Sequence, residues 1–262
     1  MKKINLLTED IFKLFWTIAL PSSIGTIFQN LYSIVDAIYA GRMISEIALA
    51  AIGQTFPIYF VIIALGIGLS IATTSTVSNY IGANNSDKAS YIFFQSLGLA
   101  IIVGIIISFL GIYYGPLILE SINNDKQTLI LSTEYMNIIY LGSTFILLLM
   151  VTNSCLAALG DTKSYRNVLV FSFFLNIILN PILISGKIVD IQLFTPLGIT
   201  GIAIATILSQ LIGLFYLLFK ISKTVIYINF KRNFIIPKFL LIKELLLQGV
   251  PASIGLMMIA LG

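Results

Sequence analysis

Long apolar runs separated by short polar breaks dominate the chain. Crossing the roughly 30 Å hydrocarbon core of a bilayer takes about 20 apolar residues at 1.5 Å rise per residue. The strands of a membrane barrel would instead be near 10 residues long and would alternate in polarity. The pattern therefore predicts an all-α membrane protein, with six transmembrane helices at approximately 12–39, 48–79, 90–119, 129–158, 167–186 and 197–219.

A basic stretch follows the sixth run, and a further apolar run then opens. We expect a six-helix lobe plus the start of a seventh helix. In residue numbers these parts are an N-terminal lobe at 1–220, a cytoplasmic amphipathic linker at 221–243, and the truncated first helix of a second lobe at 244–262.

A short internal repeat supports this division. The segment FKLFWTIALPSSIG at 12–25 aligns with IKELLLQGVPASIG at 242–255, so that a lysine precedes a proline by eight residues in both. Many secondary transporters are built from internal repeats. We therefore expect the partner of this lobe to be a missing C-terminal lobe of six helices.

Composition agrees with a membrane location. Hydrophobic residues make up 58% of the chain, charged residues 10%, and the mean hydropathy is +1.01. Soluble domains carry about 25% charged residues, so lipid is the expected surrounding of most of this chain. The basic residues lie scattered in the polar breaks, which argues against a nucleic-acid partner.

The basic residues also predict the orientation of the helices. With alternating sides, only Arg42, Lys126 and Lys187 fall on one side, and the other twelve of the 15 Lys and Arg residues fall on the opposite side. By the positive-inside rule the N-terminus and the linker face the cytoplasm. We expect a multi-pass protein of a bacterial inner membrane.

Few residues suit catalysis. The chain has no histidine, and its single cysteine, Cys155, lies inside an apolar run. Histidine is the commonest general base and metal ligand, so an intramembrane enzyme is not expected, and neither is a cofactor.

Asp36 is the only carboxylate well inside an apolar run. A charge at the bilayer centre costs about 2.5–3.5 kcal/mol on insertion scales, so an acid there usually faces a cavity and has a function. Gln29, Tyr32 and Ser33 precede it by seven, four and three residues, which places them on the same helix face. The alternative is that Asp36 lies near the outer end of its helix and reaches the headgroups. Position alone leaves both interpretations open.

The fifth run carries a second polar group of residues. Asn176 and Asn180 share a helix face, and Pro181 removes the helical partner of the Ile177 carbonyl because proline has no N–H. Two amides and a freed carbonyl suit a site that coordinates a cation or relays a proton. Hydrogen bonding between helices is the alternative use of membrane asparagines.

Other polar and small residues have two interpretations each. In the sixth run Thr206 and Gln210 are candidate site residues, whereas Gly198 and Gly201 indicate close helix packing. The hydroxyl residues of the second run either bond back to their own helix or line an aqueous cleft; they are Ser70, Thr73, Thr74, Ser75, Thr76 and Ser78.

Five segments together resemble the multidrug and toxic compound extrusion (MATE) transporters, and the resemblance spans the whole chain as an N-terminal lobe plus the start of helix seven. The segments are ALPSSIGTIFQNLYSIVDAIYAGR at 19–42, ALAAIGQTFPI at 48–58, IGANNSDKAS at 81–90, LAALGDTK at 156–163 and GITGIAIATILSQ at 198–210.

The resemblance implies two six-helix lobes around a central cleft and a set of coupling residues. Asp36 matches an acid on helix one, Asn176 an asparagine on helix five and Thr206 a threonine on helix six. Asn180 stands where the family has an aspartate, which rules out a proton relay of two carboxylates. Ala157 stands where many relatives carry arginine.

The resemblance also implies a function. We expect a secondary antiporter that exports amphiphilic organic cations or drugs in exchange for Na⁺ or H⁺, with Asp36, Asn176, Asn180 and Thr206 as the coupling site and possible Na⁺ ligands. Gln29, Tyr32, Ser33, Gln54 and Gln210 are possible cleft-lining residues. The alternatives are a lipid-linked oligosaccharide flippase of the same superfamily and a non-functional truncated fragment.

Overall fold

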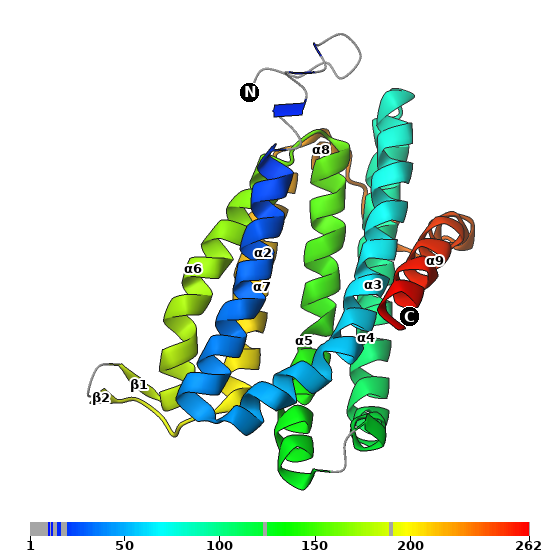
Figure 1. Cartoon of the computed structure of the whole chain (residues 1–262). Helices are drawn as coiled ribbons and strands as arrows, with labels where there is room; N and C mark the ends of the chain where they lie inside the picture. The colour runs from blue at the N-terminus through cyan, green and yellow to red at the C-terminus, as the bar shows by residue number, and fades with distance from the viewer. Residues whose placement is uncertain are drawn as a thin grey trace.

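A computed structural model describes residues 10, 12, 15–16, 20–122, 125–188 and 191–261, and these are mainly helical. Figure 1 shows long helices side by side, with one small hairpin at an end of the bundle. The elements are α2 (Leu20–Tyr39), η2 (Ala40–Ile44), α3 (Glu46–Gly82), α4 (Ser86–Ile122), α5 (Lys126–Ala158), α6 (Lys163–Ser185), β1 (Lys187–Ile188), β2 (Ile191–Gln192), α7 (Ile199–Ile221), α8 (Val225–Ile228), η3 (Arg232–Ile235) and α9 (Phe239–Leu261).

The predicted all-α membrane fold is confirmed. Among the described residues, six helices are long and apolar enough to cross a membrane, namely α3, α4, α5, α6, α7 and α9. The first predicted span begins at residue 12, and part of it lies outside the described residues; its described part forms α2. The seventh helix, α9, begins at Phe239 rather than at 244.

Polar residues in the breaks fix where the helices begin and end. Ser45 accepts a hydrogen bond from the backbone N–H of Ala48 at the start of α3, and Asp125 accepts one from Thr128 at the start of α5. These side chains satisfy N–H groups that have no partner within the helix. Gly186 ends α6 with a φ of 69°, a left-handed conformation that favours glycine.

Helix α5 lies at the centre of the bundle and packs against α3, α4 and α7. On one side of it, α2 packs on α6 and α6 packs on α7; on the other side, α9 packs on α3 (Figure 1). The candidate polar residues of the first, fifth and sixth runs therefore fall within one group of adjacent helices, α2, α6 and α7.

Small residues allow close approach of neighbouring helices. A Cβ atom added at Gly201 would lie 2.8–2.9 Å from backbone atoms of Leu183 and Ile184 on α6, so α7 touches the α6 backbone there. One added at Gly68 on α3 would lie 2.5 Å from the Gly249 carbonyl of α9. These positions agree with the interpretation of the glycines as packing residues.

The hydroxyl residues of α3 mainly bond to helix backbone. Thr73 donates to the Leu69 carbonyl at 2.7 Å and Thr76 to the Ala72 carbonyl at 2.8 Å, and both threonines are buried. Thr74 donates to the Ser154 carbonyl of α5 at 3.2 Å. Of the two interpretations left open by the sequence, bonding back to the same helix holds for Thr73 and Thr76, whereas Thr74 joins α3 to α5.

Candidate ion-coupling site

Asp36 is buried near the end of α2, with 5% of its surface exposed. Its Oδ1 atom accepts a hydrogen bond of 2.8 Å from Asn180 Nδ2 on α6, and its Oδ2 atom accepts one of 3.2 Å from Thr206 Oγ1 on α7. The side chain therefore points into the bundle, and the alternative that it reaches the headgroups is wrong. One carboxylate joins three helices that are far apart in sequence.

Asn180 connects this carboxylate to the second asparagine. The same Nδ2 atom donates to Asn176 Oδ1 at 3.0 Å, and both asparagines are fully buried. Because the two residues are four apart on α6, their side chains stack on one helix face. The structure thus brings together all four residues expected to form the coupling site, Asp36, Asn176, Asn180 and Thr206, while their role in ion coupling stays a prediction.

The carbonyl released by Pro181 is not part of this group. The hydroxyl of Tyr39, in the last turn of α2, donates to the Ile177 carbonyl at 3.0 Å. A buried carbonyl without a partner is costly, and the tyrosine supplies the missing donor. The expectation that the Ile177 carbonyl serves the cation pocket is therefore wrong; it joins α2 to α6 instead.

Several buried polar atoms around Asp36 have no hydrogen-bond partner. Among the described residues these include Asn176 Nδ2, Asn180 Oδ1, the Tyr32 hydroxyl and the Ser209 hydroxyl. Nearly all buried polar atoms in folded proteins are paired. These atoms lie around the Asp36 group, with Tyr32 adjacent to Thr206 and Ser209, so polar side chains are concentrated in this part of the bundle.

Sequence reasoning missed three residues of this region. Ser209 lies one turn after Thr206 on α7, a spacing that would have identified it. Tyr59 on α3 and Tyr135 on α5 also lie near Asp36, and their place follows only from helix packing. The sequence around a tyrosine does not show whether its hydroxyl lies near a buried acid or at the membrane interface.

The predicted cleft-lining residues fall in different places. Gln29 is exposed and lines a cavity of about 210 Å³ together with Asn153, Tyr165 and Arg166. Gln54 donates to the Leu119 carbonyl at 3.0 Å and so joins α3 to α4.

The remaining three differ in burial. Ser33 is exposed, Gln210 is half-buried one turn after Thr206, and Tyr32 is half-buried with its hydroxyl turned inward.

The donor set suits a hard cation better than a transition metal. No group of three or more His, Cys, Asp or Glu side chains able to hold a metal occurs within the described ranges. Carboxylate, amide and hydroxyl oxygens are the ligands that hard cations prefer. The group contains one carboxylate, so it carries at most one negative charge.

Comparison with known proteins identifies the family. The MatE family profile matches residues 21–182. The chain is 32% identical to a FAD transporter of Shewanella oneidensis, over 80% of this chain and 45% of the relative. It is 30% identical to a probable multidrug resistance protein NorM of Thermotoga maritima, over 90% of this chain and 50% of the relative. The chain spans about half the length of these curated relatives.

Solved structures agree. The fold matches a MOP superfamily transporter from Pyrococcus furiosus with a TM-score of 0.84 and 28% sequence identity, over 98% of this chain and 55% of that one. An outward-facing multidrug resistance MATE family transporter matches to the same degree. With the family match over most of the chain and a shared fold of membrane helices, this chain belongs to the MatE family of membrane transporters.

Proposed function

We propose that this chain is the ion-coupling, N-terminal lobe of a secondary antiporter that exports amphiphilic organic cations or drugs in exchange for Na⁺ or H⁺. The observation that carries the proposal is the buried Asp36 carboxylate, held at once by Asn180 of α6 and Thr206 of α7. An isolated charge within a membrane bundle is costly and is usually retained for function. Relatives described as multidrug export proteins support the substrate class.

The coupling would act through the packing of three helices. With Asp36 charged, its oxygens attract the donors of α6 and α7, and the three helices close around it. Neutralising the carboxylate with a proton, or binding a cation to it, removes that attraction and favours a second arrangement. Each ion state thereby stabilises a different shape of the lobe.

For Na⁺ coupling, the group that would move is the side-chain amide of Asn180. Its Nδ2 atom now lies between Asp36 Oδ1 and Asn176 Oδ1, while its own Oδ1 atom is buried without a partner. Rotating this amide by half a turn would present a third oxygen beside the other two. A side-chain amide has both a donor and an acceptor, so it would donate to Asp36 in the cation-free state and offer its carbonyl oxygen in the cation-bound state.

For proton coupling, Asp36 would act alone, because Asn180 cannot ionise. Protonation would convert one carboxylate oxygen from an acceptor to a donor. Asn180 would then lose its acceptor if Oδ1 carries the proton, and Thr206 would lose its acceptor if Oδ2 carries it. Either ion uses the same residues, and the choice is open to a direct test.

The test uses proteoliposomes with an imposed Na⁺ gradient or an imposed pH gradient, and it follows efflux of a fluorescent organic cation together with ²²Na⁺ binding. We expect one gradient to drive efflux, and Asp36→Asn to abolish it while the protein still inserts. Glu134→Gln, an exposed acid on α5, is the matched control and should transport normally. Undiminished gradient-driven efflux by Asp36→Asn would refute the proposal.

The same assay separates the fragment alternative. Binding of ²²Na⁺ or proton release that depends on Asp36, without transport, would show a coupling lobe that needs its second half. The flippase alternative has less support: among the described residues, the hydrogen-bonded group at Asp36 contains no Lys or Arg to hold a pyrophosphate. The division at 220 and 243, the cytoplasmic N-terminus and the bacterial inner membrane belong to the same proposal.

A further inference from the structure

The connection between α7 and α9 is strongly basic. We call residues 220–243 the basic connection: it contains Lys or Arg at 220, 223, 231, 232, 238 and 243, and no Asp or Glu. It leaves the end of the bundle opposite the β1–β2 hairpin, near the label α8 in Figure 1. A cluster of positive charge beside a membrane helix is a structural feature that the Asp36 site does not use.

The basic connection is held in a fixed place along α4. Gln95, which is buried on α4, donates to the carbonyls of Phe234 at 2.7 Å and Ile236 at 2.9 Å, and it accepts from the Lys238 N–H at 2.9 Å. All these partners are backbone atoms, so the contact fixes the path of the chain whatever its side chains are.

Two further contacts secure the same path. Ser90 donates to the Ile226 carbonyl at 2.6 Å, and the rings of Tyr91 and Phe234 stack at 4.5 Å. Ser90, Tyr91 and Gln95 all lie in the first turns of α4. The connection therefore follows α4 from Ser90 to Gln95, a distance of about 7.5 Å for five residues at 1.5 Å rise.

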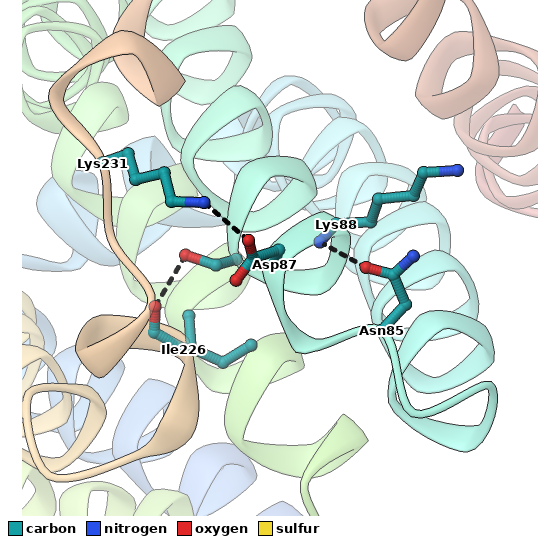
Figure 2. A network of polar contacts seen from close by, with 6 residues as sticks. Asn85, Asp87, Lys88, Ile226 and Lys231 are labelled. Atoms are coloured by element: carbon teal, nitrogen blue, oxygen red, sulfur yellow. Dashed lines mark hydrogen bonds and ion pairs between the residues drawn. The ribbon is translucent and has the colours of Figure 1, made fainter.

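Most of its positive charge has no acidic partner. Figure 2 shows the ion pair of Lys231 with Asp87, 2.6 Å between Nζ and Oδ2. The other exposed lysines of the basic connection, Lys223, Lys238 and Lys243, have no such pair within the part of the chain that the structure describes. Lys223 and Lys238 lie instead over the rings of Phe219 and Tyr91, at 4.1 and 5.1 Å.

Large apolar side chains are exposed beside these lysines. The exposed fraction is 74% for Ile228, 64% for Ile236 and 81% for Phe239. Lysines with exposed apolar neighbours are typical of segments at a lipid interface. There the apolar groups enter the acyl region and the ammonium groups stay among the headgroups.

We propose that the basic connection is a binding surface for anionic phospholipid headgroups, with Lys223, Lys238 and Lys243 as the contacts to phosphate and Gln95 as the residue that holds the surface in position. The charges of the surface and of the headgroups are complementary, and each lysine near an anionic membrane surface strengthens the attraction about fivefold. This surface works independently of the ion-coupling site, so either proposal can fail without the other.

The test measures which lipids stay bound to the protein. The whole chain is reconstituted in vesicles of equal phosphatidylcholine and phosphatidylglycerol, extracted in mild detergent, and analysed for bound lipid by mass spectrometry. We expect phosphatidylglycerol to be enriched about fivefold over phosphatidylcholine. The enrichment should fall in 0.5 M salt, where the Debye length is about 4 Å instead of about 10 Å at 0.1 M.

The variant Lys223→Gln, Lys238→Gln, Lys243→Gln should lose most of this enrichment. The matched control replaces Arg42, Lys126 and Lys187, the basic residues of the opposite end, by glutamine and should keep it. Equal binding of the two lipids by the unaltered chain would overturn the proposal, and so would an equal loss in the control variant. Since all six side chains are at least partly exposed, the fold should survive both triple changes.

Discussion

Two buried polar regions of this molecule contrast with each other. At Gln95 every side-chain polar atom has a backbone partner in the basic connection. Around Asp36 the carboxylate is paired, yet Asn176 Nδ2, Asn180 Oδ1 and the hydroxyls of Tyr32 and Ser209 are orphaned. A fully paired network has one low-energy arrangement, whereas a partly paired one keeps others within reach. The first region fixes the chain, and the second is the one that the proposed ion coupling would rearrange.

The largest expected effect comes from removing the donor to Asp36. Asn180→Leu leaves a buried carboxylate oxygen without its 2.8 Å hydrogen bond and should lower the free energy of unfolding by about 3 kcal/mol. Thermal unfolding in detergent micelles measures the loss. In an Asp36→Leu background the same change should cost much less, because the charge is gone; an equal cost in both backgrounds would mean that Asn180 acts through packing alone.

The next largest effect is expected at Gln95, in the fully paired region. Gln95→Leu removes three hydrogen bonds from the basic connection and should reduce stability by about 2 kcal/mol. Hydrogen exchange should accelerate at the Lys238 amide, which loses its acceptor. Ser96→Ala is the control, since the Ser96 hydroxyl bonds to the Ile92 carbonyl of its own helix. If exchange across 234–238 were unchanged in Gln95→Leu, side-chain packing would be what holds the connection.

A smaller effect is expected where α2 meets the proline of α6. Tyr39→Phe removes the donor to the Ile177 carbonyl and should cost about 1 kcal/mol of unfolding free energy. Pro181→Ala restores a helical N–H to that carbonyl, so Tyr39→Phe should be nearly neutral in its presence. Thermal unfolding of the two single variants and the double variant tests this; strict additivity would show that the hydroxyl is not replacing the lost helical bond.

The smallest effect is expected at Asp125, an exposed carboxylate that accepts a hydrogen bond from a threonine hydroxyl, as the buried Asp36 does. Asp125 accepts from the hydroxyl and the N–H of Thr128, and these hydrogen bonds hold the pKa of its carboxyl below the usual value. Its cap therefore stabilises α5 fully above the ordinary aspartate pKa and is lost as pH falls through the lowered one. The Thr128 amide chemical shift should titrate there, and a flat profile in Asp125→Asn is the control.

Much of this structure could be predicted from the sequence. Apolar runs long enough to cross a bilayer gave the helices α3 to α7 with ends within a few residues, because lipid demands continuous helix once a segment enters it. The start of α9 at Phe239 was misjudged, since Phe239 and Leu240 follow a basic stretch with similar apolar residues. The β1–β2 hairpin has no signal, because each strand has only two residues.

The candidate site was predictable in part for a similar reason. Asp36, Asn176, Asn180 and Thr206 stand out because polar residues are rare within apolar runs. The fate of the Ile177 carbonyl was not predictable, because it depends on where Tyr39 of a distant helix lies. Tyr59 and Tyr135 are equally invisible to a linear pattern, since contacts across a bundle depend on helix rotation.

The contact between α3 and α9 has a mechanical consequence. Gly68 and Gly249 bring the two backbones together, and only the short side chain of Ser253 on α9 is seated against Gly68. By contrast, Gly66 on the same helix is filled by Met150 of α5. Displacement of α9 along its own axis at Gly68 disturbs few rotamers, whereas displacement of α5 must repack a thioether. At these two glycines, shear of α9 against α3 thus requires less side-chain rearrangement than shear of α5 against α3.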